Sequence, residues 1–146
     1  MGGPVWAHSC GGDGRNGGAL ARLILDSGAI LALIRGDARV AAALRVARAK
    51  GDEICVPAIA AAQTIRGGPG DAPIYRLLRV VHVSFVGTRL ARAAGELLGK
   101  TSLTDVADAL IMAEALRSRP AVLMTSDPGD MSILAAGQGG ITILTV

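Results

Sequence analysis

Five short and almost uninterrupted aliphatic runs alternate along this chain with segments whose apolar residues recur every three or four positions. The runs are residues 22–25, 53–56, 80–85, 121–125 and 141–146. Runs this short and this apolar are typical of strands buried on both faces, and parallel sheets bury their strands in this way beneath covering helices. The alternation predicts an α/β fold, a three-layer α/β/α sandwich around a five-stranded parallel sheet.

The segments between these runs carry the start and stop signals of helices. Pro57 can open a helix at its first turn, Gly51 can end one, and Thr104 is a suitable N-cap. We expect helices at residues 28–35, 38–49, 59–66, 72–79, 88–98 and 104–117, and a short helix that begins at Pro128. A chain of 146 residues is long enough for one domain and too short for two ordinary ones.

The first 18 residues differ from the rest, because they contain seven glycines and no apolar periodicity. Such a segment buries too little apolar surface to offset its ordering entropy. Residues 1–18 are therefore predicted to be a disordered leader or a vector-derived remnant, with the domain at residues 19–146. These 18 residues also lack the apolar core of a signal peptide, and charges interrupt every longer apolar stretch, so we expect a cytoplasmic protein without a membrane span.

Charge and composition narrow the partners that this chain can have. The net charge is +3, and 13 of the 15 cations are arginine, a residue suited to bidentate contact with phosphate or carboxylate. An anionic partner fits this balance, although net charge alone identifies neither a fold nor a specificity. One Tyr and one Phe cannot form the stacking platform of a base-reading RNA-binding protein. The two cysteines form no CxxC pair and no disulfide framework.

Aspartates follow two of the apolar runs closely. Asp26 comes directly after the first run and Asp127 soon after the fourth, with Asp130 one turn beyond it. Open parallel sheets bind ligands at the carboxyl ends of the strands that flank a switch in strand order, so Asp26 and Asp127 meet there if their strands are neighbours. Asp105 and Asp108 are three residues apart on one helix and can reach the same crevice.

Several carboxylates at one place repel one another unless a cation lies between them. Hard oxygen ligands without His or Cys favour Mg²⁺ or Mn²⁺ over Zn²⁺. The sequence therefore predicts a divalent-metal site formed by Asp26, Asp105, Asp108, Asp127 and Asp130. The alternative for any single one of these residues is an N-cap or a first-turn acid that interacts with the helix dipole.

Four segments resemble the motifs of PIN-domain ribonucleases, in particular the VapC-type toxins of toxin–antitoxin pairs. They are LILDSGAILAL at 23–33, VPAIAAAQTIRGG at 56–68, TDVADALIMAEA at 104–115 and VLMTSDPGDM at 122–131. The resemblance implies the strand order 3-2-1-4-5, a Mg²⁺- or Mn²⁺-dependent nuclease, an RNA substrate, a homodimer and a cognate antitoxin protein. By position, the metal-binding catalytic acids are Asp26, Asp108 and Asp127, and the auxiliary acids are Asp105 and Asp130.

At one catalytic position the chain departs from the pattern of the family it resembles. Gln63 stands where the second motif carries a glutamate, and neither Glu53, Glu96 nor Glu114 obviously replaces it. Gln keeps the shape of Glu and one acceptor oxygen, but it lacks the charge that holds a second cation or deprotonates a water. Two functions stay open: a metal-dependent endoribonuclease weakened by Gln63, and a catalytically degenerate or inactivated PIN domain that binds RNA or antitoxin.

In the endoribonuclease hypothesis, the metal polarises the scissile phosphate and activates a water, while Arg35, Arg39 and Arg66 attract the RNA because they lie close to the crevice in sequence. Two other doubly wound classes also gather acids at strand ends. A response-regulator receiver needs a lysine after a late strand, and a haloacid-dehalogenase-like phosphatase needs Asp-x-Asp after the first strand. This chain has lysine only at positions 50 and 100 and has Asp26-Ser27-Gly28 after the first run, so it matches neither class.

Overall fold

The computed structural model describes residues 20–146, so the prediction for residues 1–18 lies outside the described residues. The strands are β1 (Arg22–Leu25), β2 (Glu53–Pro57), β3 (His82–Ser84), β4 (Ala121–Thr125) and β5 (Ile141–Thr145). The helices are α1 (Ser27–Ile34), α2 (Ala38–Lys50), α3 (Ala58–Thr64), α4 (Ala72–Leu78), α5 (Thr88–Lys100), α6 (Val106–Arg117) and α7 (Pro128–Leu134). A 3₁₀ turn, η1 (Pro69–Asp71), precedes α4.

The five strands pair in parallel in the order β3-β2-β1-β4-β5, which confirms the predicted fold and strand order. β1 lies in the middle, with Ile24 opposite both Cys55 of β2 and Leu123 of β4. The chain builds the sheet outwards from β1 to β3 and then returns to add β4 and β5 on the other side. The strand order therefore switches between β1 and β4, and the carboxyl ends of these two strands flank the crevice where such sheets bind ligands.

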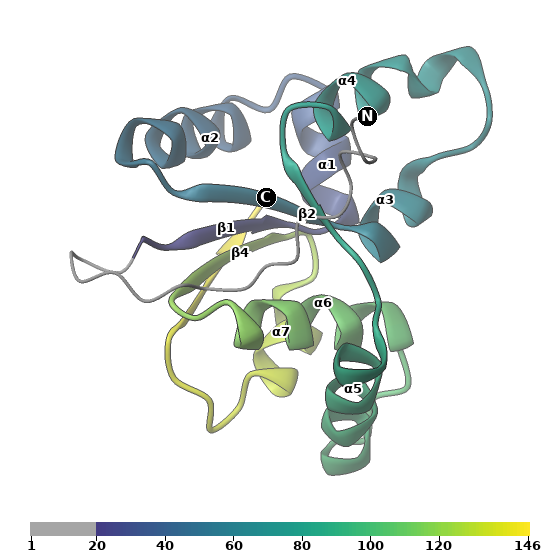
Figure 1. Ribbon diagram of the computed structural model, residues 1–146, viewed down its shortest axis with the longest axis vertical. Helices are drawn as coiled ribbons and strands as arrows, with labels where there is room; N and C mark the ends of the chain where they lie inside the picture. The colour runs from purple at the N-terminus through teal and green to yellow at the C-terminus, as the bar shows by residue number, and fades with distance from the viewer. Residues whose placement is uncertain (1–19) are drawn as a thin grey trace, which may run out of the picture.

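Helices cover both faces of the sheet (Figure 1), with α1 to α4 on one side and α5 to α7 on the other. The largest fully buried apolar side chains come from the central strands and from both helical layers, and they include Ile24, Leu25, Ile30, Ile111, Met112 and Leu123. The strands are almost continuously apolar because each face of the sheet meets a helix. Within residues 20–146, no helix is long and apolar enough to cross a membrane.

Two local predictions are wrong. Thr104 does not cap α6, because the N-cap is Asp105, whose carboxylate accepts the N–H of Asp108 at 3.1 Å. The third strand is shorter than residues 80–85, because β2 supplies register partners only for His82–Ser84. Residues 80 and 85, at the two ends of the predicted run, are exposed to solvent.

Candidate active site

Asp26 follows the last residue of β1 and is the N-cap of α1. Its N–H donates to the carbonyl of Met124 at 3.1 Å, which continues the pairing of β1 with β4, and its carboxylate accepts the N–H of Ala29 at 2.7 Å. The residue is buried, with 5% of its surface exposed. Burial raises the pKa of the Asp26 carboxyl, while hydrogen bonds from Thr125, Ala29 and Ser126 act in the opposite direction.

The start of α1 lies against the turn that follows β4. A Cβ atom on Gly28 would lie 2.1 Å from Oγ and 2.6 Å from Cβ of Ser126, so this approach requires glycine. Within the turn, the N–H of Asp127 donates to Oγ1 of Thr125 at 2.9 Å, and the Asp127 side chain is exposed. The turn that carries Asp127 therefore lies directly against the start of α1, and the Ser126 N–H joins it to the Asp26 carboxylate.

The remaining three candidate acids lie at the starts of the helices α6 and α7. Asp105 and Asp108 are at the start of α6, Asp130 is in the first turn of α7, and the two helices pack together. The pKa of Asp108 is raised to about 6, first by burial and then by the charges of Asp105, Asp127, Asp130 and Asp26. The other four aspartates predicted as metal ligands therefore lie within electrostatic range of Asp108, and we call the five together the acidic cluster.

The acidic cluster is not neutralised by cationic side chains. Across residues 20–146, none of the five carboxylates forms an ion pair with Arg, Lys or His. In the same part of the chain, no three His, Cys, Asp or Glu side chains form a ready-made metal-binding group. The donor chemistry fits a hard divalent cation, because all five groups are carboxylates whose mutual repulsion falls when a cation binds. A metal held by Asp26, Asp108 and Asp127 stays a prediction.

Gln63, the fourth predicted catalytic residue, lies in the last turn of α3. Its side chain is half-buried, and α3 packs against α6, the helix that begins with Asp105 and Asp108. As a neutral amide, Gln63 adds no charge to the acidic cluster. Its role in catalysis stays a prediction.

The three arginines predicted to contact RNA differ in their surroundings. Nη2 of Arg39 lies 3.0 Å from a carboxylate oxygen of Asp37. Arg66 donates from Nη1 to the carbonyl of Ile65 at 2.9 Å. Arg35 is the exposed C-cap residue of α1, and no carboxylate in the described part of the chain forms an ion pair with it. Of the three, only Arg39 is paired with a carboxylate among those residues, and Arg35 and Arg66 are not.

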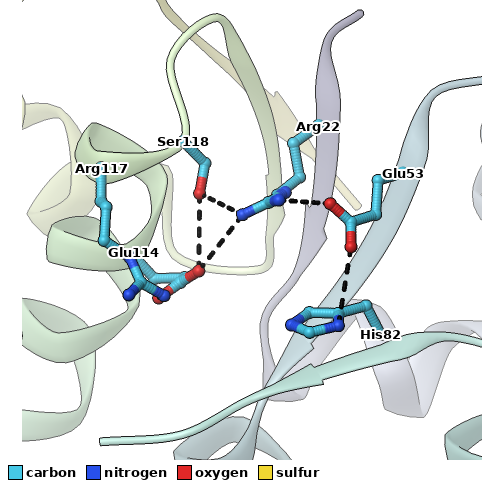
Figure 2. Close-up of polar contacts among 6 residues, drawn as sticks. All are labelled: Arg22, Glu53, His82, Glu114, Arg117 and Ser118. Carbon is cyan, nitrogen blue, oxygen red and sulfur yellow. Dashed lines mark hydrogen bonds and ion pairs between the residues drawn. The ribbon is translucent and has the colours of Figure 1, made fainter. Parts of the chain in front are cut away.

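A second polar network, which was not predicted from the sequence, lies at the opposite, amino end of the sheet (Figure 2). The fully buried carboxylate of Glu114 in α6 is bound by Arg117 at 2.6 Å and by Arg22 at 3.6 Å. Arg22, the first residue of β1, also pairs with Glu53, and Glu53 lies 3.5 Å from Nδ1 of His82. The sequence did contain a signal for one of these pairs. Arg22 and Glu53 are the first residues of two predicted strands, carry opposite charges and are register partners in the sheet.

A further buried carboxylate, that of Asp71 in η1, also escaped prediction. It accepts the main-chain N–H groups of Arg66 at 2.9 Å and Gly67 at 2.6 Å. These bonds close the loop that follows α3, which gives Asp71 a structural role.

Comparisons with known proteins agree with this architecture. The family model described as PIN domain matches residues 23–135. Solved structures with a similar fold include VapBC2 from Rickettsia felis bound to a DNA fragment from its promoter, with a TM-score of 0.68 and 13% identity over 86% of this chain and 98% of that one. A toxin–antitoxin complex from Klebsiella pneumoniae has a TM-score of 0.65 and 19% identity over 82% of this chain and 95% of that one.

A third structure of similar fold is VapBC-1 from nontypeable Haemophilus influenzae, with a TM-score of 0.63 and 18% identity over 85% of this chain and 97% of that one. No curated protein matches the sequence. Identities this low show a shared fold and leave the chemistry to be argued from the residues themselves.

Proposed function

Because this chain belongs to the PIN domain family, we propose that it is a metal-dependent endoribonuclease that hydrolyses RNA phosphodiesters. We further propose that it is the toxin of a toxin–antitoxin pair, acts in the cytoplasm as a homodimer and is restrained by a cognate antitoxin protein. The chains of similar fold come from toxin–antitoxin complexes, and this origin supports the antitoxin as a partner.

One observation carries the nuclease proposal. Five carboxylates from three separate segments gather at the carboxyl ends of β1 and β4, and burial together with the charges of the other four raises the pKa of Asp108 to about 6. A fold that only needed stability would neutralise such charges, as it does for Glu114 with two arginines. Uncompensated charge at the switch point of a parallel sheet is typical of a site built for a ligand.

In this proposal, different residues of the chain would bind the metal, orient its ligands and attract the RNA. Asp26, Asp108 and Asp127 would hold Mg²⁺ or Mn²⁺, with Asp105 and Asp130 adding negative charge around it. The bound metal would polarise the scissile phosphate and lower the pKa of an attacking water. The hydrogen bonds from Ala29 and Ser126 orient the Asp26 carboxylate, and Arg35, Arg39 and Arg66 would attract the RNA backbone.

The test is cleavage of a labelled structured RNA in Mg²⁺ by the wild-type chain and by Asp26→Asn, which keeps an N-cap oxygen. We expect a loss of about 100-fold or more, since even the outer-shell partners of a metal contribute about 10- to 100-fold. The matched control is Glu96→Gln, an exposed carboxylate on α5 whose loss leaves cleavage unchanged. Cleavage that survives both Asp26→Asn and Asp108→Asn would contradict the assignment.

A second function is favoured by Gln63, which lacks the charge of a glutamate. In this alternative the chain is a catalytically degenerate or inactivated PIN domain that binds RNA or antitoxin without turnover. Gln63→Glu separates the two: a rise in Mg²⁺-dependent cleavage supports a nuclease weakened at this position. Failure of both the wild type and Gln63→Glu to cut RNA that they bind supports the binding module.

A further inference from the structure

A groove of about 490 Å³ opens between α1 and the turn that follows β4. Gly28, Leu31, Ala32 and Arg35 form the α1 wall, and Ser126 lies on the opposite side. These α1 residues recur at three- and four-residue spacing, so they form one face of the helix. The groove therefore has a small apolar surface formed by α1. Ser126 adds a hydroxyl group to the lining, and Arg35 adds a guanidinium group at the C-terminal end of α1.

The groove is continuous with the acidic cluster. Main-chain N–H groups of two of its lining residues, Gly28 and Ser126, hydrogen-bond to the carboxylate of Asp26. Ser126 also directly precedes Asp127 in the chain. A ligand that lies in the groove would thus end where the candidate catalytic carboxylates begin.

The groove is lined by one cationic and one anionic side chain, Arg35 and Asp37. Asp37 lies on the rim, but its carboxylate is paired with Arg39 at 3.0 Å and caps α2. Among the side chains that line the groove, Arg35 is the one charge for which the described residues supply no ion-pair partner. A guanidinium in this setting suits a phosphate, to which it can donate two parallel hydrogen bonds.

We propose that this groove holds the RNA strand on one side of the scissile bond, with Arg35 bound to a backbone phosphate and the apolar surface against a sugar or base. The inference rests on the proposed ribonuclease function and adds the path of the substrate to it. Arg35 lies nine residues beyond Asp26, which is about 13 Å along a helix. Its phosphate is therefore a different one from the phosphate that is cut.

The test measures binding of fluorescein-labelled single-stranded RNA by anisotropy, in Mg²⁺ and in EDTA, with strand integrity checked on a gel after each titration. One probe is a dinucleotide, and the other has roughly 12 nucleotides, within the site sizes of single-strand-binding proteins. The variants are Arg35→Gln and the matched control Arg45→Gln, which removes the same charge from an exposed position on α2 outside the groove.

We expect Arg35→Gln to weaken binding of the longer strand about 10-fold, as for loss of a charge-assisted hydrogen bond. The slope of log affinity against log salt should fall by about 0.7, the value for one phosphate in a single strand. Binding of the dinucleotide, and binding of either strand to Arg45→Gln, should stay within about twofold of wild type, because a lone exposed charge acts weakly at a distance.

Equal affinities of Arg35→Gln and Arg45→Gln for the longer strand would overturn the inference, and so would an equal loss for the dinucleotide. A glutamate-rich peptide serves as the competing ligand: if it binds in an Arg35-dependent manner while RNA does not, the groove binds protein and the inference fails. All of these outcomes leave the cleavage test at Asp26 untouched. Arg35-dependent RNA binding by a wild-type chain that does not cleave RNA in Mg²⁺, or whose cleavage survives Asp26→Asn and Asp108→Asn, would instead remove the nuclease function alone.

Discussion

At the amino end of the sheet, the buried carboxylate of Glu114 is held by Arg22 and Arg117. At the carboxyl end, the buried carboxylate of Asp26 is held by backbone N–H groups and the hydroxyl of Thr125. The two residues are almost equally inaccessible, with 0% and 5% of their surface exposed. Burial therefore does not distinguish them, and the difference lies in the countercharge.

This contrast separates two uses of a buried acid in one fold. At the amino end, Arg22 bridges Glu114 to Glu53, so the charges there are compensated within the chain (Figure 2). At the carboxyl end, burial and the charges of four other aspartates raise the pKa of Asp108, so its ionised form destabilises the fold. The first end compensates its charges within the fold, and the second leaves its charges uncompensated, as the proposed metal site requires.

The contrast between the two ends can be tested by measuring stability. The largest loss of stability should come from removing Glu114, the acid whose charge is compensated. Glu114→Ala leaves Arg22 without its buried partner and opens a space in the core, so we expect the free energy of unfolding to fall by about 3 kcal/mol. Urea denaturation followed by circular dichroism measures this change. The matched control is Glu96→Ala, which breaks an exposed Arg–Glu pair on α5 and should cost about 0.5 kcal/mol or less. Similar losses for the two variants would contradict the structural role of the amino end.

A smaller loss of stability should follow when the close approach of Gly28 to Ser126, at the carboxyl end of the sheet, is disturbed. Gly28→Ala introduces a Cβ atom 2.6 Å from Cβ of Ser126, so we expect a loss of about 2 kcal/mol from the resulting displacement. Adding Ser126→Gly removes the opposing atoms and should restore most of the stability, which thermal unfolding can measure. If Gly28→Ala alone is neutral, the turn after β4 does not lie tightly against α1.

The smallest expected effect is a gain in stability, in contrast to the two losses above. The pKa of Asp108 is raised from 3.8 to about 6 in the folded protein, so its ionisation destabilises the fold as pH rises through that range, and the full stability is present below about pH 4. In EDTA at pH 7.5, Asp108→Asn should therefore stabilise the protein, by at most about 1 kcal/mol after solvent screening and a lost helix-dipole interaction.

The gain from Asp108→Asn should vanish at pH 4, where the wild-type carboxyl is also neutral in the folded protein. Thermal unfolding across this pH range follows the difference between the two proteins. Added Mg²⁺ at pH 7.5 should raise the melting temperature of the wild type more than that of Asp108→Asn, because a ligand that binds only the folded state stabilises it. Destabilisation by Asp108→Asn at pH 7.5 in EDTA would show that the carboxyl end is compensated after all.

Much of the fold could be predicted because its signals are local. The run at 22–25 is apolar on both faces, as β1 requires in the centre of the sheet. The position of β4 beside β1 depended on a resemblance to a family, since no local signal fixes which strands pair. Thr104 and Asp105 are adjacent and are both suitable caps. Only the path of the chain decides that the Asp105 carboxylate reaches the N–H of Asp108.

The candidate site was predictable as a list of acids and unpredictable as an electrostatic arrangement. Asp26 and Asp127 could be found because each follows an apolar run closely. The bridge from Arg22 to Glu114 could not, because it joins residues far apart in sequence and one of them was expected only as a helix residue. The approach of Gly28 to Ser126 was hidden for the same reason, since it exists only after β1 and β4 pair.

The late position of β4 has a consequence for the order in which activity can arise during synthesis. Proteins are made from the amino terminus, and domains fold as units once their chain is available. Asp26 leaves the ribosome before β2 to β5 have been made, whereas Asp127 and Asp130 follow β4. A nascent chain that stops short of β4 therefore lacks Asp127, Asp130 and the strand that pairs with β1 next to Asp26, so the acidic cluster can assemble only after β4 has been made.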